Sequence, residues 1–181
     1  IESLEMDSDS KLSLYRDIFI FSCNGGGERI SDLLTLRWKE FDGLHINFST
    51  TKTETQLSIL LPKKALEIIK KYKTKERKKT QFIFPVLLDS LDMNDPRAVD
   101  SAISRSTALM NKSLKVIARL SRIEKNISSH TARHTWATRA LRKGISIDKV
   151  SKLLGHTTIK QTQVYAKIVN AELDKAMLVF N

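Results

Sequence analysis

The chain has 181 residues, which is enough for one full-sized domain with its own core and short for two. It carries 31 Lys and Arg against 20 Asp and Glu, which gives a formal net charge of +11. A polyanion, and above all a nucleic acid, is therefore the expected partner, although a solvated basic surface would explain the same charge. No apolar run approaches the roughly 18 residues of a membrane span, and the single cysteine, Cys23, excludes an internal disulfide and a multi-cysteine zinc site.

The first part of the chain predicts two helices separated by a glycine-rich turn. The first helix follows Ser10, a suitable N-cap, and the second begins at Arg29, after the stretch NGGGE. The apolar residues at helical spacing are Leu14, Ile18 and Phe21 in the first helix and Ile30, Leu33, Leu34 and Trp38 in the second.

Two short runs, residues 43–50 and 55–62, predict an antiparallel hairpin with Lys52 at its turn. Pro62 opens another helix, which runs to about Tyr72 and continues into a strongly basic loop. That basic run is most often a solvated surface, and at best it supplies phosphate contacts without sequence information. Residues 81–86 are either a short strand or an extended segment.

The second half of the chain predicts helices only. One helix runs from Asp95 to about Leu120, three more lie within residues 128–168, and residues 170–180 form a last amphipathic helix. The predicted fold class is therefore α+β, mostly α with a small antiparallel β-sheet.

Arg29 is a candidate anion-binding residue because of its position. It follows three glycines and opens a helix, where the macrodipole disfavours a cation unless an anion lies nearby. A phosphate would satisfy the arginine and the helix start together, but a surface arginine after a plain turn is the stronger interpretation of this residue alone. The glycines do not form a P-loop, because no Gly-Lys-Ser/Thr follows them.

His130 and Arg133 lie at another helix start. Ser128 or Ser129 caps this helix, and the two side chains, three residues apart, lie on a face of its first turn that differs from the buried face. His130 and His134 are four residues apart, but residue 131 is not Glu, so the zinc-protease pattern fails and no metal site is expected. A His-x-x-Arg pair alone is more often a solvated helix start than a site.

His156 and Tyr165 lie in a turn and on the helix that follows it. Gly155 closes the preceding helix, which leaves His156 in a turn, where a side chain is free to face a ligand. A tyrosine on an amphipathic helix is by itself usually a core or interface residue.

Taken together, these residues resemble the tyrosine recombinase (phage integrase) family in type and order. The most specific stretches are HTARHTWAT and LLGHTTIKQTQVYAKI, and RISDLLTLRW resembles the family's first box. The positions that match the family's catalytic residues are Arg29, Lys52, His130, Arg133, His156 and Tyr165. The resemblance covers residues 11–179 and implies that residues 1–181 are the C-terminal catalytic domain, without the family's N-terminal arm-binding and core-binding domains.

The chain departs from the family pattern before the first arginine. The family usually has Thr-Gly-Leu or Thr-Gly-Met there, whereas this chain has Gly-Gly-Glu, with Glu28 in the apolar position, which leaves the placement of Arg29 open. Lys63 and Lys64 compete with Lys52 for the role of the family's lysine. Lys52 is preferred because it lies at the hairpin turn.

The resemblance implies a site-specific recombinase or integrase that cleaves and rejoins DNA through a covalent 3′-phosphotyrosine, for integration or excision of a mobile element, with no metal and no cofactor. The chemistry of the residues agrees with this. Two guanidiniums neutralise charge on the phosphate oxygens, a histidine accepts the proton of the tyrosine, a second histidine donates to the phosphate, and a lysine protonates the leaving 5′-hydroxyl. Arg29 and Arg133 are the two guanidiniums, and His130 accepts the proton of Tyr165. His156 is the second histidine, and Lys52 is the lysine.

The expected partner is a double-stranded DNA recombination site, with a homotetramer in the synaptic complex, a monomer without DNA, and accessory DNA-bending proteins in some reactions. Because the chain begins at Ile1 and has no signal-like stretch, we expect a piece of a larger cytoplasmic protein that joins the bacterial nucleoid when bound to DNA. The apolar stripe of residues 170–180 either packs on its own domain or docks in trans on a neighbouring subunit.

Two alternatives remain at the level of sequence. A type IB topoisomerase has similar chemistry, but such enzymes usually carry Lys in place of the histidine of the His-x-x-Arg pair. A non-catalytic helix-turn-helix protein would explain residues 137–165 and the charge. It would leave Arg29, Lys52 and Tyr165 without a joint role.

Overall fold

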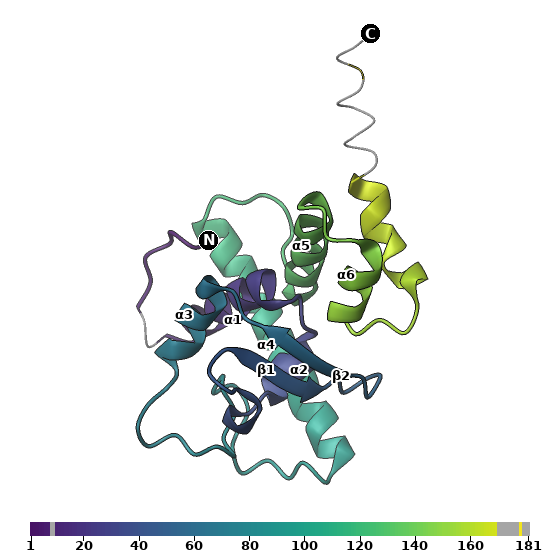
Figure 1. Cartoon of the computed structure of the whole chain (residues 1–181). Helices are drawn as coiled ribbons and strands as arrows, with labels where there is room; N and C mark the ends of the chain where they lie inside the picture. The colour runs from purple at the N-terminus through teal and green to yellow at the C-terminus, as the bar shows by residue number, and fades with distance from the viewer. Residues whose placement is uncertain (8–9, 170–177, 179–181) are drawn as a thin grey trace.

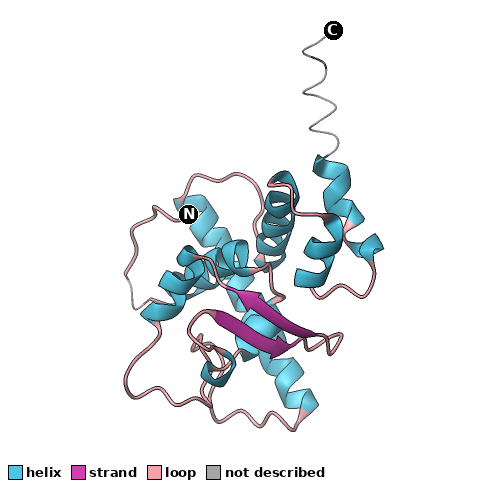
Figure 2. Ribbon diagram, in the orientation of Figure 1, coloured by secondary structure: helices cyan, strands magenta, loops and turns pink. Residues whose placement is uncertain are grey.

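The computed structural model describes residues 1–7, 10–169 and 178 of the chain. These residues are mostly helical with one two-stranded antiparallel sheet, which confirms the predicted fold class (Figures 1 and 2). The elements are α1 (Lys11–Gly25), α2 (Ile30–Thr35), η1 (Trp38–Glu40), β1 (His45–Ser49), β2 (Gln56–Leu60), α3 (Lys63–Lys71), α4 (Pro96–Leu120), α5 (Ser129–Arg142), α6 (Ile147–Leu153) and η2 (Ile159–Gln161). Residues 163–169 are also helical. No helix of the described chain is long and apolar enough to cross a membrane.

The central helix of the fold is α1. It begins at the predicted cap, where the Ser10 side chain accepts a hydrogen bond from the Ser13 N–H at 3.1 Å. It packs against α3, α4 and α5, so that most of its side chains are buried. In the view of Figure 1, α3 and α6 lie on opposite sides of the molecule, with α1 and α5 between them.

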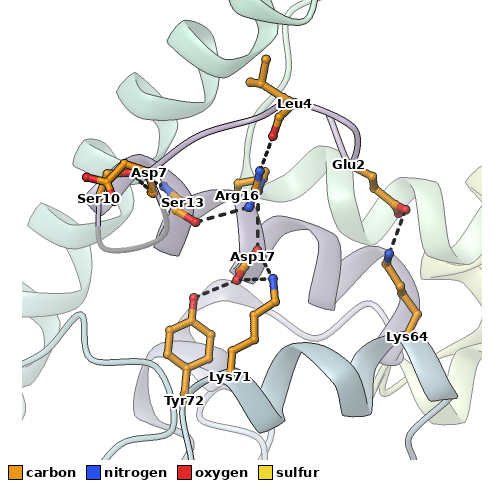
Figure 3. Close-up of polar contacts among 10 residues, drawn as sticks. All are labelled: Glu2, Leu4, Asp7, Ser10, Ser13, Arg16, Asp17, Lys64, Lys71 and Tyr72. Atoms are coloured by element: carbon orange, nitrogen blue, oxygen red, sulfur yellow. Dashed lines mark hydrogen bonds and ion pairs between the residues drawn. The ribbon is translucent and has the colours of Figure 1, made fainter.

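A buried carboxylate on α1 holds α3 in place (Figure 3). Asp17 accepts hydrogen bonds from Lys71 Nζ at 3.0 Å and from the Tyr72 hydroxyl at 3.1 Å, and Arg16 Nε lies 3.6 Å from its other oxygen. Burial, and then the charge of Asp17, raises the pKa of Tyr72. Because the buried charge has several partners, this network fixes the angle between α1 and α3 without leaving an unpaired ion.

The strands β1 and β2 form the predicted hairpin. His45 pairs with Leu60 at its open end. The Thr50 N–H donates to the Thr55 carbonyl at 3.0 Å at the turn end, and Lys52 lies within that turn. The next helix, α3, begins directly afterwards with Pro62 as its N-cap, as predicted.

The helix after the glycines is shorter than predicted, because α2 ends at Thr35 and does not reach Trp38. Residue Leu36 is extended, and its carbonyl accepts a hydrogen bond from the Ile83 N–H at 2.8 Å, while the Trp38 N–H donates to the Gln81 carbonyl at 3.0 Å. A continued helix would use the same backbone groups internally. Pairing with the extended segment 81–86 therefore ends α2, and Trp38 is buried from a short 3₁₀ helix instead.

The other predicted helices are present, and caps set their ends. Asp95 accepts hydrogen bonds from the first turn of α4, and Ser128, rather than Ser129, caps α5. The predicted amphipathic helix of residues 170–180 falls almost entirely outside the described residues.

Buried apolar side chains form two clusters. The larger core joins α1, α2, the hairpin, α3, the segment 82–87, α4 and the start of α5. The smaller cluster lies between the second half of α5, α6 and the helical residues 163–169, and its buried members are Ala137, Ala140, Val150, Leu154 and Tyr165.

Candidate active site

A pocket of about 640 Å³ lies where the two clusters meet. The residues that line it come from the turn before α2, the hairpin turn, the start of α5, the turn after α6 and the helix at 163–169. They include every predicted site residue, namely Arg29, Lys52, His130, Arg133, His156 and Tyr165. The fold therefore brings together in one cavity side chains from five separate segments of the chain.

Arg133 is the most buried cation of this pocket, with 5% of its surface exposed. We predicted that Arg133 and His130 share a face of the first turn that differs from the buried face; both line the pocket, but Arg133 is buried and only His130 is exposed. The guanidinium donates to the Gly27 carbonyl at 2.7 Å and to the Leu154 carbonyl at 2.5 Å. Burial, and then the charge of Arg29, lowers the pKa of Arg133 to about 10, so it is a cation at neutral pH.

The three glycines before α2 place Arg29 in the same pocket. Gly27 has a positive φ of 69°, and a methyl group on it would lie 3.1 Å from Leu154 Cδ2 and 3.2 Å from Trp136 Cβ. Only glycine fits this turn, which lets the backbone approach α5 and α6 closely. The departure from the family pattern therefore does not displace Arg29 from the pocket.

Arg29 has a free donor in this position. It is the N-cap of α2, and its Nη2 donates to the Gly155 carbonyl at 3.3 Å. Its Nη1 is buried and has no hydrogen-bond partner within the described chain. A buried N–H of a guanidinium without a partner is costly, and an anion bound in the pocket would satisfy it.

His156 is held by the end of α6. The backbone N–H of His156 donates to the Ser151 carbonyl at 3.0 Å, and the backbone N–H of Gly155, a residue with a φ of +61°, donates to the Lys152 carbonyl. These two hydrogen bonds form a Schellman motif. The Nδ1 atom of His156 lies 2.8 Å from the hydroxyl of buried Thr162. Burial, and then the charges of the two pocket arginines, lowers the pKa of His156 to about 4, so it is neutral at pH 7. A neutral ring whose Nδ1 accepts from the hydroxyl carries its proton on Nε2, where it can donate to a ligand.

Tyr165 is 4% exposed and is packed against the side chain of His134. The ring of His134 lies 5.1 Å from the ring of Tyr165 and 4.4 Å from the ring of His130, both edge-on. Burial raises the pKa of Tyr165, and the charge of Arg133 acts in the opposite direction. From the sequence we considered His134 only as a metal ligand, and its contact with Tyr165 was not predicted, although His134 is part of the stretch HTARHTWAT.

Lys52 lies between two anchored residues of the hairpin turn. The N–H and hydroxyl of Thr51 donate to Asp32 Oδ1 on α2 at 2.9 and 2.8 Å, and the Thr53 hydroxyl donates to the Gly155 carbonyl at 3.4 Å. The competing lysines, residues 63 and 64, lie on α3 and are not part of the pocket lining.

The site holds cations and hydrogen-bond donors, together with one tyrosine. In the part of the chain that the structure describes, no group of three or more His, Cys, Asp and Glu side chains is arranged to hold a metal ion. Two guanidiniums, a lysine and a neutral histidine line one cavity together with the tyrosine, and such cations and donors are the groups with which proteins bind phosphate.

The chain belongs to the phage integrase family, whose family model matches residues 2–172. It is 31% identical to a tyrosine recombinase of Thermosipho africanus over 148 residues, which is 81% of this chain and 47% of that protein. It is 30% identical to the tyrosine recombinase XerD of Listeria monocytogenes over 172 residues, which is 92% of this chain and 54% of that protein. The chain thus spans about half the length of the curated relatives that it matches.

Solved structures share the fold. A XerH site-specific recombinase bound to palindromic difH substrate, a post-cleavage complex, has a TM-score of 0.66 and 18% identity, covering 99% of this chain and 49% of that chain. The XerA recombinase has a TM-score of 0.59 and 16% identity, covering 95% of this chain and 64% of that chain. The observed fold is therefore that of a tyrosine recombinase catalytic domain.

Proposed function

We propose that residues 1–181 are the catalytic domain of a site-specific DNA recombinase that cleaves and rejoins DNA through a covalent 3′-phosphotyrosine, without a metal or a cofactor. The observation that carries this proposal is the convergence of a tyrosine, two arginines, a lysine and histidines on one pocket. Relatives named as tyrosine recombinases and a neighbour described as a post-cleavage complex on a difH substrate support the same reaction class.

In this mechanism the two arginines bind the scissile phosphate. The unpartnered Nη1 of Arg29 and the remaining N–H groups of Arg133 donate to its non-bridging oxygens, where negative charge builds up during attack. His156 donates through Nε2, with Thr162 fixing its ring. Such donors stabilise the transition state most when the protein has placed them beforehand, as the carbonyl contacts of both arginines do here.

The covalent step exchanges one P–O bond for another. The Tyr165 oxygen attacks phosphorus and forms a new P–O bond while the bond to the 5′-oxygen breaks. His130, the exposed histidine of the pocket, accepts the tyrosine proton, and Lys52 gives a proton to the departing 5′-oxygen. Rejoining reverses these transfers, so the energy of the P–O bond is conserved in the phosphotyrosine.

The proposed substrate is a double-stranded DNA recombination site, as in the neighbours whose structures are described as DNA-bound. We propose a monomer without DNA and a homotetramer in the synaptic complex, with the family's other domains preceding this one. The site chemistry fits integration and excision of a mobile element equally well. We propose that the reaction takes place in the cytoplasm.

A denaturing gel with nicked suicide DNA in EDTA tests the proposal. The full-length protein should form a covalent adduct with this DNA, and Tyr165→Phe should abolish the adduct while leaving DNA binding unchanged. Tyr72→Phe is the matched control, because Tyr72 contacts Asp17 and is not part of the pocket lining. Bound DNA without any wild-type adduct would contradict the catalytic proposal and favour the helix-turn-helix alternative.

A further inference from the structure

The lining of the pocket includes a carboxyl group that the proposed reaction does not use. Glu28 directly precedes Arg29, lines the pocket and is 5% exposed. Both of its carboxyl oxygens are buried and have no hydrogen-bond partner within the described chain. An ionised carboxylate in such a place costs several kcal/mol, so a group of this kind takes up a proton instead.

The glycine turn encloses this carboxyl group. A methyl group on Gly25 would lie 3.1 Å from Glu28 Oε1, and one on Gly26 would lie 3.0 Å from it. The carboxyl group of Glu28 therefore fills space that side chains at these two glycine positions would occupy. These glycines also form the C-terminal end of α1, where the helix dipole disfavours a negative charge.

Charged and titratable groups face Glu28 from each element around it. Burial is the largest effect and raises the pKa of Glu28 to about 8; the charge of Arg133 on α5 opposes the rise, and that of Asp32 on α2 adds to it. Cys23 on α1 also interacts with this group: burial raises the pKa of Cys23, and the charge of Glu28 is a smaller effect in the same direction. The other ionisable residues that line the same pocket are Arg29, Lys52, His130, His134, His156 and Tyr165.

Arg133 is the pocket cation whose charge acts on Glu28. Its guanidinium does not pair with Glu28; it donates to the carbonyl of Gly27, the residue before Glu28, and to that of Leu154. Arg133 forms no ion pair within the described chain, which leaves its guanidinium available to a phosphate. A carboxylate at residue 28 would place a full negative charge beside the same guanidinium.

We propose that Glu28 is a positioning residue that sets the charge of the phosphate pocket: as a neutral acid it leaves Arg133 available to the scissile phosphate, and as a carboxylate it competes with that phosphate and slows cleavage. The inference rests on the proposed function for its effect on cleavage. The buried neutral acid itself is independent of that function.

The first test is the pH profile of single-turnover cleavage of suicide DNA by the full-length protein. Wild type, Glu28→Gln and Glu28→Leu should cleave at similar rates at pH 7. Above pH 8 the wild-type rate should fall, so that at pH 9 the two variants exceed it by about tenfold, as expected for the loss of one required proton. Superimposable profiles for wild type and Glu28→Gln would overturn the inference, because a purely structural role changes the rate equally at every pH.

A second measurement does not depend on cleavage. The folded pKa of Glu28 lies above its ordinary value of 4.5, so the folded state holds a proton that the unfolded state has lost. The stability of wild type relative to Glu28→Gln should therefore fall as pH rises from about 5 to about 8. An equal pH dependence of the two melting temperatures overturns the inference, whereas this difference without cleavage by any variant contradicts only the proposed function.

Discussion

The larger core and the smaller cluster are stabilised in different ways. The larger core packs three helices around α1 and adds aromatic pairs such as Phe21 with Phe84, whose ring centroids are 5.4 Å apart. The smaller cluster has few buried side chains, and its outer face shows Ile159, Val164 and Ile168 with 47%, 57% and 46% of their surfaces exposed. Burial alone therefore holds the helical residues 163–169, which include Tyr165, much less firmly than it holds the rest of the domain.

Hydrogen bonds from site residues hold the two clusters together. Arg133 joins the Gly27 carbonyl to the Leu154 carbonyl, and Arg29 and Thr53 both donate to the Gly155 carbonyl. The groups proposed to bind phosphate thus also attach α6 to the larger core. We therefore expect phosphate binding by these arginines to be coupled, through the end of α6, to the position of Tyr165.

The largest effect is expected from Arg133→Ala. Cleavage should fall by about 10²–10³-fold or more, because a transition-state donor is lost. Two buried carbonyl oxygens also lose their partner, which should lower the free energy of unfolding by about 1–3 kcal/mol. Adduct formation and urea denaturation measure the two effects. Arg119→Ala, at an exposed position of α4, is the control, and an Arg133→Ala protein as stable as that control would show that the arginine does not attach the clusters.

The next effect is expected from Gly155→Ala. Its φ of +61° disfavours alanine by about 1–2 kcal/mol, and the added methyl would lie 3.1 Å from Thr50 Cγ2. Stability and cleavage should both fall, because α6 and the hairpin turn move apart. Gly144→Ala is a matched control, since its φ is +80° but nothing lies within 4 Å of the added methyl. Equal losses of melting temperature in the two variants would remove the role assigned to the close approach.

A smaller effect is expected from Thr162→Val, which keeps the shape of the side chain and removes the hydroxyl beside His156 Nδ1. Loss of this hydrogen bond should lower the cleavage rate by about 3- to 10-fold, in line with about 1 kcal/mol for such a bond. Single-turnover kinetics measure the change. Thr158→Val, at an exposed position outside the pocket lining, should leave the rate unchanged, and an equal loss there would argue against ring positioning by Thr162.

A further effect is expected on the pH dependence of stability. The pKa of His156 in the folded state is lowered to about 4 from an ordinary 6.5. Between these two pH values the unfolded state therefore binds a proton that the folded state does not bind. Stability should therefore fall as pH drops from about 6.5 to about 4, and His156→Asn should flatten that part of the melting curve against pH. An unchanged slope in His156→Asn would show that this histidine is not buried in neutral form.

Sequence patterns predicted most helices because their causes are local. Ser10 and Asp95 cap the helices that follow them, and Gly155 ends α6 through its positive φ. The end of α2 was predicted wrongly, because a backbone pairing with residues 81–83, far along the chain, overrides the local helical spacing. The burial of Arg133 was also missed, since its acceptors lie in two distant turns.

The candidate site shows the same division. The sequence by itself determined the residue types, their order and the local elements that carry them, because caps, turns and helical periodicity depend on neighbours along the chain. Only the tertiary structure decided which side chains share one pocket, that Arg29 keeps an unpartnered donor, and that Glu28 is enclosed without a partner. These properties come from contacts between segments far apart in sequence, and desolvation and pairing act only once the chain has folded.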